Sequence, residues 1–166
     1  MSLASVKAEL ARIAPEIEVL EHERPTATVT QAAEVHGVEP GQIAKTLSLR
    51  VGDRVMLVVV RGDARLDNRK ARAAFGGKAR MLGGEEVETI TGHPVGGVCP
   101  FGLVSPLAVY CDVSLKDYAE VWPAAGSINS SVCVTPDRMA ELTGATWVDV
   151  SQAPAEVTDQ AAAEAS

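Results

Sequence analysis

The chain has 166 residues, 46% of them hydrophobic and 22% charged, with a formal net charge of −7 at pH 7. This is the composition of one ordinary globular domain, and no apolar run is long enough to cross a bilayer. The three cysteines, Cys99, Cys111 and Cys133, have no paired spacing, which argues against a disulfide framework and a structural zinc site. We therefore expect a reduced, cytoplasmic protein without metal or cofactor.

Hydrophobic spacing and capping signals predict the elements of the first half of the chain. In chain order these are a helix over 2–13, a strand over 16–22, a helix from Thr30 to His36 stopped by Gly37, strands over 43–51 and 54–60, a helix from Asp67 to Gly76, and a short helix or turn over 85–91. The turn Gly52-Asp53 joins the two longer strands, so a β-hairpin is the expected central unit.

The second half of the chain predicts strands over 107–111 and 131–134, a helix over 135–144 and a last strand over 146–150. Thr135-Pro-Asp137 is a strong helix start, because it offers a capping hydroxyl and then proline at the first helical position. A hairpin and an excess of strands favour a mixed α/β domain over a doubly wound parallel sheet. We expect one domain over 1–152 and an acidic, alanine-rich tail over 153–166.

Charge is unevenly distributed along the chain. Ten basic and three acidic residues lie between positions 45 and 80, a net charge of +7, which leaves −14 for the rest. Such asymmetry can place a basic face on an acidic protein, although a solvated hairpin and helix explain the segment equally simply. Phe75 is the one aromatic side chain there, which favours contact with phosphates over stacking on bases.

The segment 91–102 is an apolar loop containing four glycines and two prolines. Glycine lets the backbone turn through positive φ and approach another molecule closely, whereas proline stiffens the chain. A loop that is apolar rather than hydrophilic therefore indicates a rigid, partly buried wall that presents main-chain groups to a ligand.

Lys45 is the most informative charged residue. The strand period of two places it in one row with Ile43, Leu47 and Leu49, where it is the charged member of an apolar face. One interpretation is a lysine near the start of a strand that extends its amine to the rim. The other is a cation held at the mouth of a cavity, where it binds a carbonyl, phosphate or ribose oxygen.

Other polar residues offer weaker signals. His93 could act as a general base, but a histidine in such a loop is more often exposed and without function. Cys99 could be a nucleophile, although a small buried thiol is the simpler interpretation. Asp112 is expected to cap a turn or orient a site group, and Ser127 and Asn129 form a polar turn that could line a pocket. No spacing identifies a Ser-His-Asp or Cys-His catalytic system.

Several of these segments, taken in order, resemble the YbaK/EbsC family of prolyl-tRNA editing deacylases, which is related to the insertion domain of bacterial prolyl-tRNA synthetases. The specific anchors are Lys45-Thr-Leu47 and the Gly-x-x-x-Pro loop of Gly96 to Pro100. The apolar strand at Leu57 to Val60, the helix start at Leu66-Asp67, Thr91-Gly92 and Phe101-Gly102 extend the match. The resemblance covers about residues 1 to 150.

The resemblance implies a curved, barrel-like mixed sheet flanked by helices, and hydrolysis of the ester that joins a mischarged amino acid, such as Cys or Ala, to tRNA. Lys45 would contact the terminal adenosine or the aminoacyl carbonyl, and Gly96 and Gly97 would place main-chain groups against the aminoacyl group. The substrate-binding residues it implies are Thr46, Gly92, Pro100, Asp112 and Ser127. No metal or obligatory protein nucleophile is implied.

The positions that differ between subgroups of the family do not all match one subgroup. Thr46 matches Cys-deacylating members, Cys99 stands where Ser is common, and the segment 127–131 lacks the glycine-rich stretch of the Cys-specific group. We predict a trans-acting deacylase of Cys-tRNA(Pro) or Ala-tRNA(Pro) type. Its partner is aminoacylated tRNA, with prolyl-tRNA synthetase or an elongation factor as candidate protein partners. The alternatives are a non-catalytic module that binds tRNA ends or aminoacyl-nucleotides, and a thiol enzyme that uses Cys99.

Overall fold

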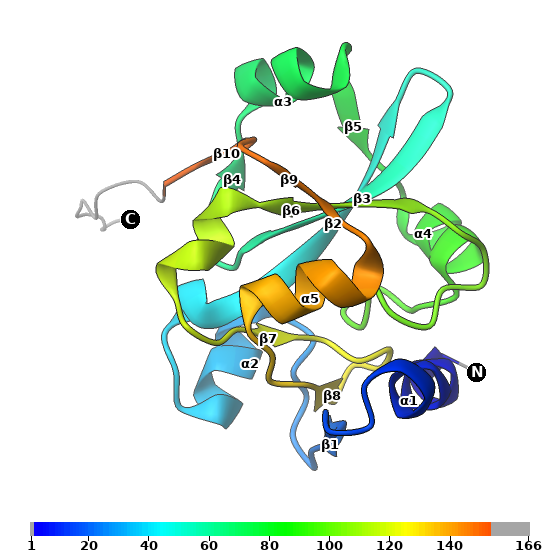
Figure 1. Cartoon of the computed structure of the whole chain (residues 1–166), viewed down its shortest axis with the longest axis vertical. Helices are drawn as coiled ribbons and strands as arrows, with labels where there is room; N and C mark the ends of the chain where they lie inside the picture. The colour runs from blue at the N-terminus through cyan, green and yellow to red at the C-terminus, as the bar shows by residue number, and fades with distance from the viewer. Residues whose placement is uncertain (1, 154–166) are drawn as a thin grey trace.

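The computed structural model describes residues 2–153 and shows a mixed α/β fold (Figure 1). The tail predicted over 153–166 lies outside the described residues apart from residue 153. No helix in the described part of the chain combines the length and the apolar character needed to cross a membrane.

A six-stranded mixed sheet forms the centre of the fold. Its main path runs β5-β2-β3-β6-β9, and the short β7 also pairs with β2. The strands are β2 (Ile43–Val51), β3 (Arg54–Arg61), β5 (Ala79–Met81), β6 (Ala108–Asp112), β7 (Trp122–Pro123) and β9 (Thr146–Val148). The predicted hairpin is confirmed: β2 and β3 pair antiparallel from Val51 opposite Arg54 to Ala44 opposite Arg61.

Five α-helices surround the sheet: α1 (Ser2–Ile13), α2 (Val29–His36), α3 (Asn68–Phe75), α4 (Gly84–Thr91) and α5 (Pro136–Thr143). The expected caps of α3 and α5, Asp67 and Thr135, are confirmed. The start of the second helix was predicted wrongly. Thr28, not Thr30, caps α2, because the Thr28 hydroxyl accepts from the Gln31 N–H at 3.1 Å while the Gln31 side chain accepts from the Thr28 N–H.

The helices cover both faces of the sheet (Figure 1). On one face, α1 and α5 pack on alternate residues of β3 and β6 through a core that includes Val6, Leu10, Leu57, Val59 and Met139. On the other face, α3 packs on the remaining residues of β2 and β3 through Leu49, Val58, Val60, Ala71 and Phe75. Both rows of the hairpin are therefore buried, which explains why its strands are nearly continuous apolar runs.

The expectation of a barrel-like sheet is wrong. Within the described residues, β5 and β9 lie at opposite ends of the strand order and do not pair with each other. A barrel needs an unbroken ladder of hydrogen bonds around the whole sheet. Here the outer edge of β2 is paired only at its two ends, with β7 at residues 43–44 and with β5 at residues 49–51.

The shortest strands were not predictable from the local sequence. The strand expected over 16–22 is only β1 (Leu20–Glu21), which pairs with β8 (Ser130–Ser131) where 131–134 was expected. β4 (Arg65–Leu66) pairs with β10 (Ser151–Gln152), and neither was predicted. Two-residue strands carry no periodicity, so only their distant partners define them. The 3-10 helices η1 (Pro40–Gln42) and η2 (Val113–Asp117) complete the fold.

Candidate functional site

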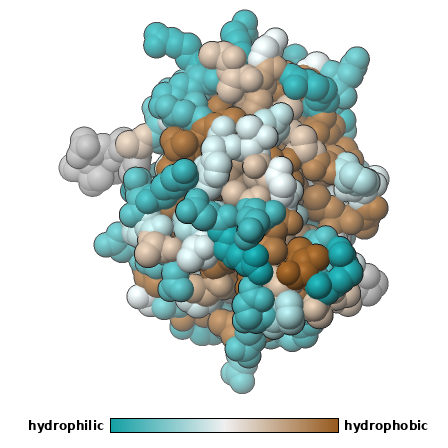
Figure 2. Space-filling view, in the orientation of Figure 1, coloured by the Kyte–Doolittle hydropathy of each residue, from teal (hydrophilic) through white to brown (hydrophobic). Residues whose placement is uncertain are grey.

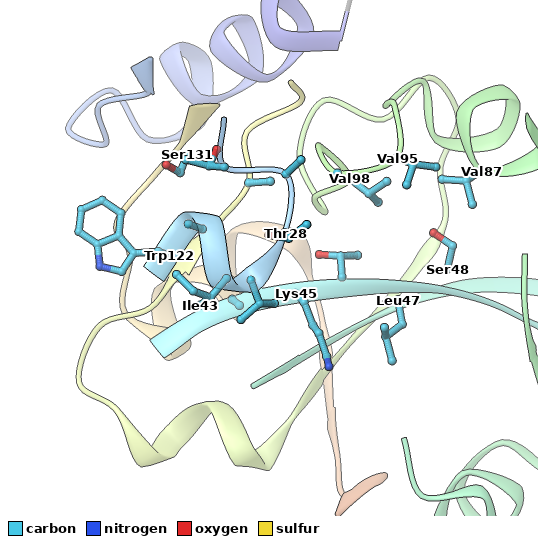
Figure 3. Close-up of a pocket in the computed structure, with 18 of the residues that line it drawn as sticks. Thr28, Ile43, Lys45, Leu47, Ser48, Val87, Val95, Val98, Trp122 and Ser131 are labelled. Atoms are coloured by element: carbon cyan, nitrogen blue, oxygen red, sulfur yellow. The ribbon is translucent and has the colours of Figure 1, made fainter. Parts of the chain in front are cut away.

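A cavity of about 480 Å³ opens beside β2. The N-terminal end of α2, the start of α4, the glycine loop and the strands β7 and β8 enclose it, and the floor is the stretch of β2 from residue 43 to residue 48 (Figure 3). The walls are mostly apolar, with Val29, Val87, Val98 and Trp122 among them. An enclosed apolar cavity with a few polar groups is the usual form of a small-ligand site.

Thr46 lies at the centre of this floor. Its hydroxyl oxygen, Oγ1, is buried and has no hydrogen-bond partner, and it is the one side-chain oxygen or nitrogen of residues 2–153 in that condition. A buried hydroxyl without a partner costs about 1–3 kcal/mol, but this atom is covered by its neighbours, so a ligand in the cavity could reach it only after a local shift of the floor. The prediction that Thr46 binds substrate stays a prediction, but the residue lies where that role requires.

Gly96 is the glycine of this loop that lines the cavity, between the side chains of Val95 and Val98. Its φ is 93°, in the left-handed region that favours glycine. A Cβ added there would lie 2.8 Å from the Cβ of Ala27, so the loop packs tightly against the segment before α2. Within residues 2–153 the N–H and C=O of Gly96 make no hydrogen bond, which leaves both groups for a ligand.

Gly97 does not line the cavity, contrary to the role expected for it. Its N–H donates to the Pro94 carbonyl at 2.9 Å, and its own carbonyl accepts from the Gly126 N–H at 3.0 Å. A Cβ at Gly97 would approach the Ser127 nitrogen to 2.7 Å. The second glycine therefore serves the packing of two loops, and its main-chain groups are already used.

Four other expected substrate contacts also lie outside the cavity lining: Gly92, Pro100, Asp112 and Ser127. Gly92, with φ 82°, ends α4 and packs against Val104. Pro100 borders a different depression, next to Leu103. The Ser127 hydroxyl bonds to the side chains of Asn129 and Ser130, at 3.0 and 2.6 Å.

Asp112 is fully buried and holds the sheet together instead. Its carboxylate accepts from the Ser114 N–H at 3.0 Å, the Val150 N–H at 2.7 Å and the Ser151 hydroxyl at 2.6 Å. The bonds from Val150 and Ser151 join the end of β6 to the chain after β9, and the bond from Ser114 caps the following 3-10 helix. The expectation that Asp112 caps a turn is confirmed by the bond to Ser114, whereas nothing of its carboxylate faces the cavity.

Lys45 lines the cavity, but its side chain does not face the glycine loop. Figure 3 shows the Lys45 and Leu47 side chains on one side of β2, and Thr28, Val95 and Val98 on the other. Burial lowers the pKa of the half-buried ammonium below its ordinary value, while the nearby Asp63 carboxylate opposes this shift. Asp63 is itself paired with Arg61 at 2.6 Å, and Lys45 has no salt-bridge partner within the described residues.

The expected position of Lys45 opposite Gly96 is therefore corrected. Strand alternation puts Thr46 on the cavity side and Lys45 on the other, so the two neighbours flank the same unpaired edge from different faces.

His93 and Cys99 form a buried structural pair. His93 was expected to be exposed, which is wrong: its side chain is inaccessible, bonded through Nδ1 to the Ser2 hydroxyl and through Nε2 to the Phe101 carbonyl at 2.7 Å. Cys99 is also inaccessible, and burial raises the pKa of its thiol to about 12. A thiol that stays protonated and out of reach of solvent is not a nucleophile, so the Cys99 enzyme hypothesis is not supported.

One wall of the cavity was missed at the sequence level. Trp122 and Ser131 line it, and behind them His36 stacks on Trp122 with ring centroids 3.9 Å apart. The Ser131 hydroxyl bonds to Nε2 of His36 at 2.8 Å and to Nε2 of His22 at 3.1 Å. Burial, with a smaller contribution from His22, lowers the pKa of His36 to about 4, so His36 is neutral near pH 7. These residues are far apart in sequence, and no local pattern joins them.

The arrangement can hold an apolar group against its walls and polar atoms at the unpaired main-chain groups of Gly96. Within residues 2–153 no group of three or more His, Cys, Asp or Glu side chains is arranged to hold a metal ion. The chemistry available to the side chains and main chain is positioning and electrostatic stabilisation.

Residues 23–142 match the family model of the aminoacyl-tRNA editing domain. A Bacillus subtilis (strain 168) protein, the uncharacterized protein YwhH, is 50% identical over 152 residues, which are 90% of this chain and 97% of that protein. The proline–tRNA ligase of Bacillus licheniformis is 28% identical over 130 residues, 76% of this chain but only 22% of the ligase.

Solved structures agree with these similarities. A crystal structure described provisionally as a trans-editing enzyme for prolyl tRNA synthetase superimposes with a TM-score of 0.84 at 36% identity. The superposition covers 91% of this chain and 97% of that one. The similarity therefore extends over nearly all of both chains.

Proposed function

Because the chain belongs to the aminoacyl-tRNA editing domain family, we propose that it is a free-standing deacylase that hydrolyses the ester between a mischarged amino acid and tRNA. The observation that carries the proposal is the cavity beside β2, where Gly96 and Thr46 offer polar groups without partners inside apolar walls. Its size suits an aminoacyl group and part of a terminal nucleotide.

In the proposed reaction, water adds to the acyl carbon, the bond from that carbon to the ribose oxygen breaks, and the ribose oxygen takes up the proton that the water loses, which leaves a free amino acid and a ribose hydroxyl. The main chain of Gly96 positions the aminoacyl group, and the Lys45 ammonium on the other face of β2 binds a ribose or phosphate oxygen of the terminal nucleotide. An activated ester needs little more than positioning and charge stabilisation, so the proposal requires no protein nucleophile.

The apolar walls favour a small, uncharged amino-acid side chain. Val87, Val98 and Trp122 could not pair a charged group, and an unpaired charge among them would carry a large desolvation cost. Cys-tRNA(Pro) and Ala-tRNA(Pro) are therefore the first substrates to test, and we place the reaction in the cytoplasm, where tRNA is charged.

Deacylation of a panel of mischarged tRNAs tests the proposal directly. We expect release of Cys or Ala from tRNA(Pro) at catalytic protein concentrations, with Pro-tRNA(Pro) hydrolysed more slowly. The control is the same tRNA incubated without protein, which measures spontaneous ester hydrolysis. Binding of aminoacylated tRNA without turnover of any substrate would instead indicate a non-catalytic module.

A basic surface leads toward the cavity and is proposed to bind tRNA phosphates. Hydrophilic side chains project at the upper end of the molecule, where α3 and the β2–β3 hairpin lie, with less polar side chains between them (Figure 2). The exposed cations of this region that have no salt-bridge partner within the described residues include Arg54, Arg69, Arg72, Lys78 and Arg80. β5 carries Arg80 and ends at Met81, which lines the cavity, so Arg80 lies next to a residue of the cavity wall.

Replacing Arg72 and Arg80 together with alanine is expected to weaken tRNA binding and to lower its salt dependence. Each lost phosphate contact should reduce the slope of log K against log salt concentration by roughly 0.7–0.9. The measurement is the affinity for deacylated tRNA between low and moderate salt. Arg12→Ala, a change on the exposed side of α1, is the matched control and should leave the slope unchanged. An unaltered slope in the double variant would place the phosphate contacts elsewhere.

A further inference from the structure

Among the residues that the structure describes, 2–153, the edge of β2 that forms the cavity floor has a gap in its hydrogen bonding. β7 pairs with β2 at residues 43–44, β5 pairs with it at residues 49–51, and the Leu82 N–H donates to the Ser48 carbonyl at 3.0 Å. Between these partners lies a stretch of three residues. Unpaired backbone at a strand edge is a template for another extended segment.

The direction of the free groups follows from two observed bonds. Because Ser48 bonds outward to Leu82, strand alternation turns the N–H and C=O of Thr46 outward as well. The Arg61 N–H donates to the Ser114 hydroxyl at 3.2 Å, away from β2, so its partner Ala44 also faces outward. The main-chain N–H and C=O groups of Lys45 and Leu47 point toward β3 instead. The gap therefore exposes the main-chain groups of one residue, Thr46.

We infer that Thr46 holds the main-chain part of the aminoacyl group, with its α-ammonium on the Thr46 carbonyl and its acyl oxygen on the Thr46 N–H. The bound amino acid then completes the sheet edge as one extended residue between β7 and β5. This inference rests on the proposed function and deepens it, because it assigns the part of the substrate that each Thr46 group recognises. It is the β-augmentation mode of peptide recognition reduced to a single residue.

The Thr46 hydroxyl supplies an additional contact. Its Oγ1 is buried and has no partner within residues 2–153, so we expect a small shift of the floor on binding to bring this hydroxyl to the ligand. The carbonyl, N–H and hydroxyl of Thr46 would contact the α-ammonium and the acyl group, which all amino acids share. Selection among amino acids is then left to the apolar walls, where Val87 and Val98 limit the size of the side chain.

Non-hydrolysable analogues separate these contacts from the reaction. The probes are 3′-alanylamido-3′-deoxyadenosine, which keeps the α-ammonium, and the 3′-propionylamido compound, which lacks it but is otherwise nearly identical. With the full chain we expect the alanyl compound to bind about 10- to 100-fold more tightly, as for a hydrogen bond to a charged group. Amide exchange of Thr46, observed by NMR, should slow when the alanyl compound binds, while the Leu47 amide stays protected throughout.

Two variants test the hydroxyl. Thr46→Val keeps the branched shape and the main chain, so its Kd for the alanyl compound should rise about 5-fold, and its Tm should rise by about 2–4 °C because an unpartnered buried hydroxyl is removed. Thr46→Ser keeps the hydroxyl and should bind like the unmodified protein.

Equal affinities for the two compounds, or an unchanged Thr46 amide in the bound state, would overturn the inference. So would failure of both compounds to bind to a protein that hydrolyses Ala-tRNA(Pro). Absence of hydrolysis together with the expected binding pattern would overturn the deacylase proposal and leave the Thr46 subsite standing. The two ideas therefore fail under different results.

Discussion

Lys45→Ala is expected to lower kcat/KM for the hydrolysis of mischarged tRNA about 100-fold, because the charge-assisted bonds of one ammonium are worth up to about 3 kcal/mol. The Lys45 ammonium is half-buried, has no salt-bridge partner within the described residues and borders the edge where the substrate is proposed to lie. Its removal relieves an unfavourable burial of charge, so the free energy of unfolding should not fall. The measurements are steady-state deacylation and thermal unfolding of the same preparation.

Two further variants serve as controls for the Lys45→Ala result. Lys116→Ala removes a lysine that lies over the Trp147 ring, at 4.2 Å from its centroid and outside the cavity lining, and should leave kcat/KM unchanged. Lys45→Arg keeps the positive charge, so it should be more active than Lys45→Ala. Its wider head group fits the same oxygen less well, so it should be less active than the unmodified protein. Full activity in a folded Lys45→Ala protein would remove Lys45 from the proposed site.

Gly96→Ala is expected to abolish most deacylation, with kcat/KM at least 100-fold lower. The new Cβ would lie 2.8 Å from the Cβ of Ala27, so the loop or the start of α2 has to move, and displacements of about 1 Å in a positioning site can cost this much. The positive φ of 93° adds roughly 1–2 kcal/mol of backbone strain. Single-turnover hydrolysis, with unfolding measured in parallel, separates the two effects.

The chain offers a matched control for the strain. Gly144 ends α5 with φ 66°, and a Cβ there would meet nothing within 4 Å. Gly144→Ala should therefore lose a similar free energy of unfolding while its kcat/KM stays unchanged. If both alanine variants lose activity equally, global destabilisation explains the loss and the positioning role of Gly96 is contradicted.

Periodicity and capping predicted the longer elements well. The hairpin of β2 and β3 was foreseen because nearly continuous apolar runs flank a Gly-Asp turn, and α5 was foreseen because Thr135 and Pro136 are adjacent in the sequence. These signals act within a few residues, so the local sequence contains all of the information. The short strands failed for the opposite reason: β1 and β4 exist only through partners about a hundred residues away.

The candidate site was predicted in part. The sequence indicated Lys45, Thr46 and Gly96 as neighbours of a ligand, and all three border one cavity. It also suggested Gly97, Asp112 and Ser127, whose polar groups bond to other parts of the protein. Residue type and spacing reveal that a polar group exists, but not whether another segment already satisfies it.

The sequence by itself determined the mixed α/β fold, the hairpin and the glycine loop, because strand period, turns and caps are local properties of the chain. Only the tertiary structure decided which groups remain free. Gly97 packs against a second loop, and the Lys45 side chain points away from the glycine loop. Within residues 2–153, the outward main-chain groups of Thr46 and its hydroxyl have no hydrogen-bond partner at the edge between β7 and β5. A hydrogen bond can be counted as missing only after every segment that could have supplied it has been placed.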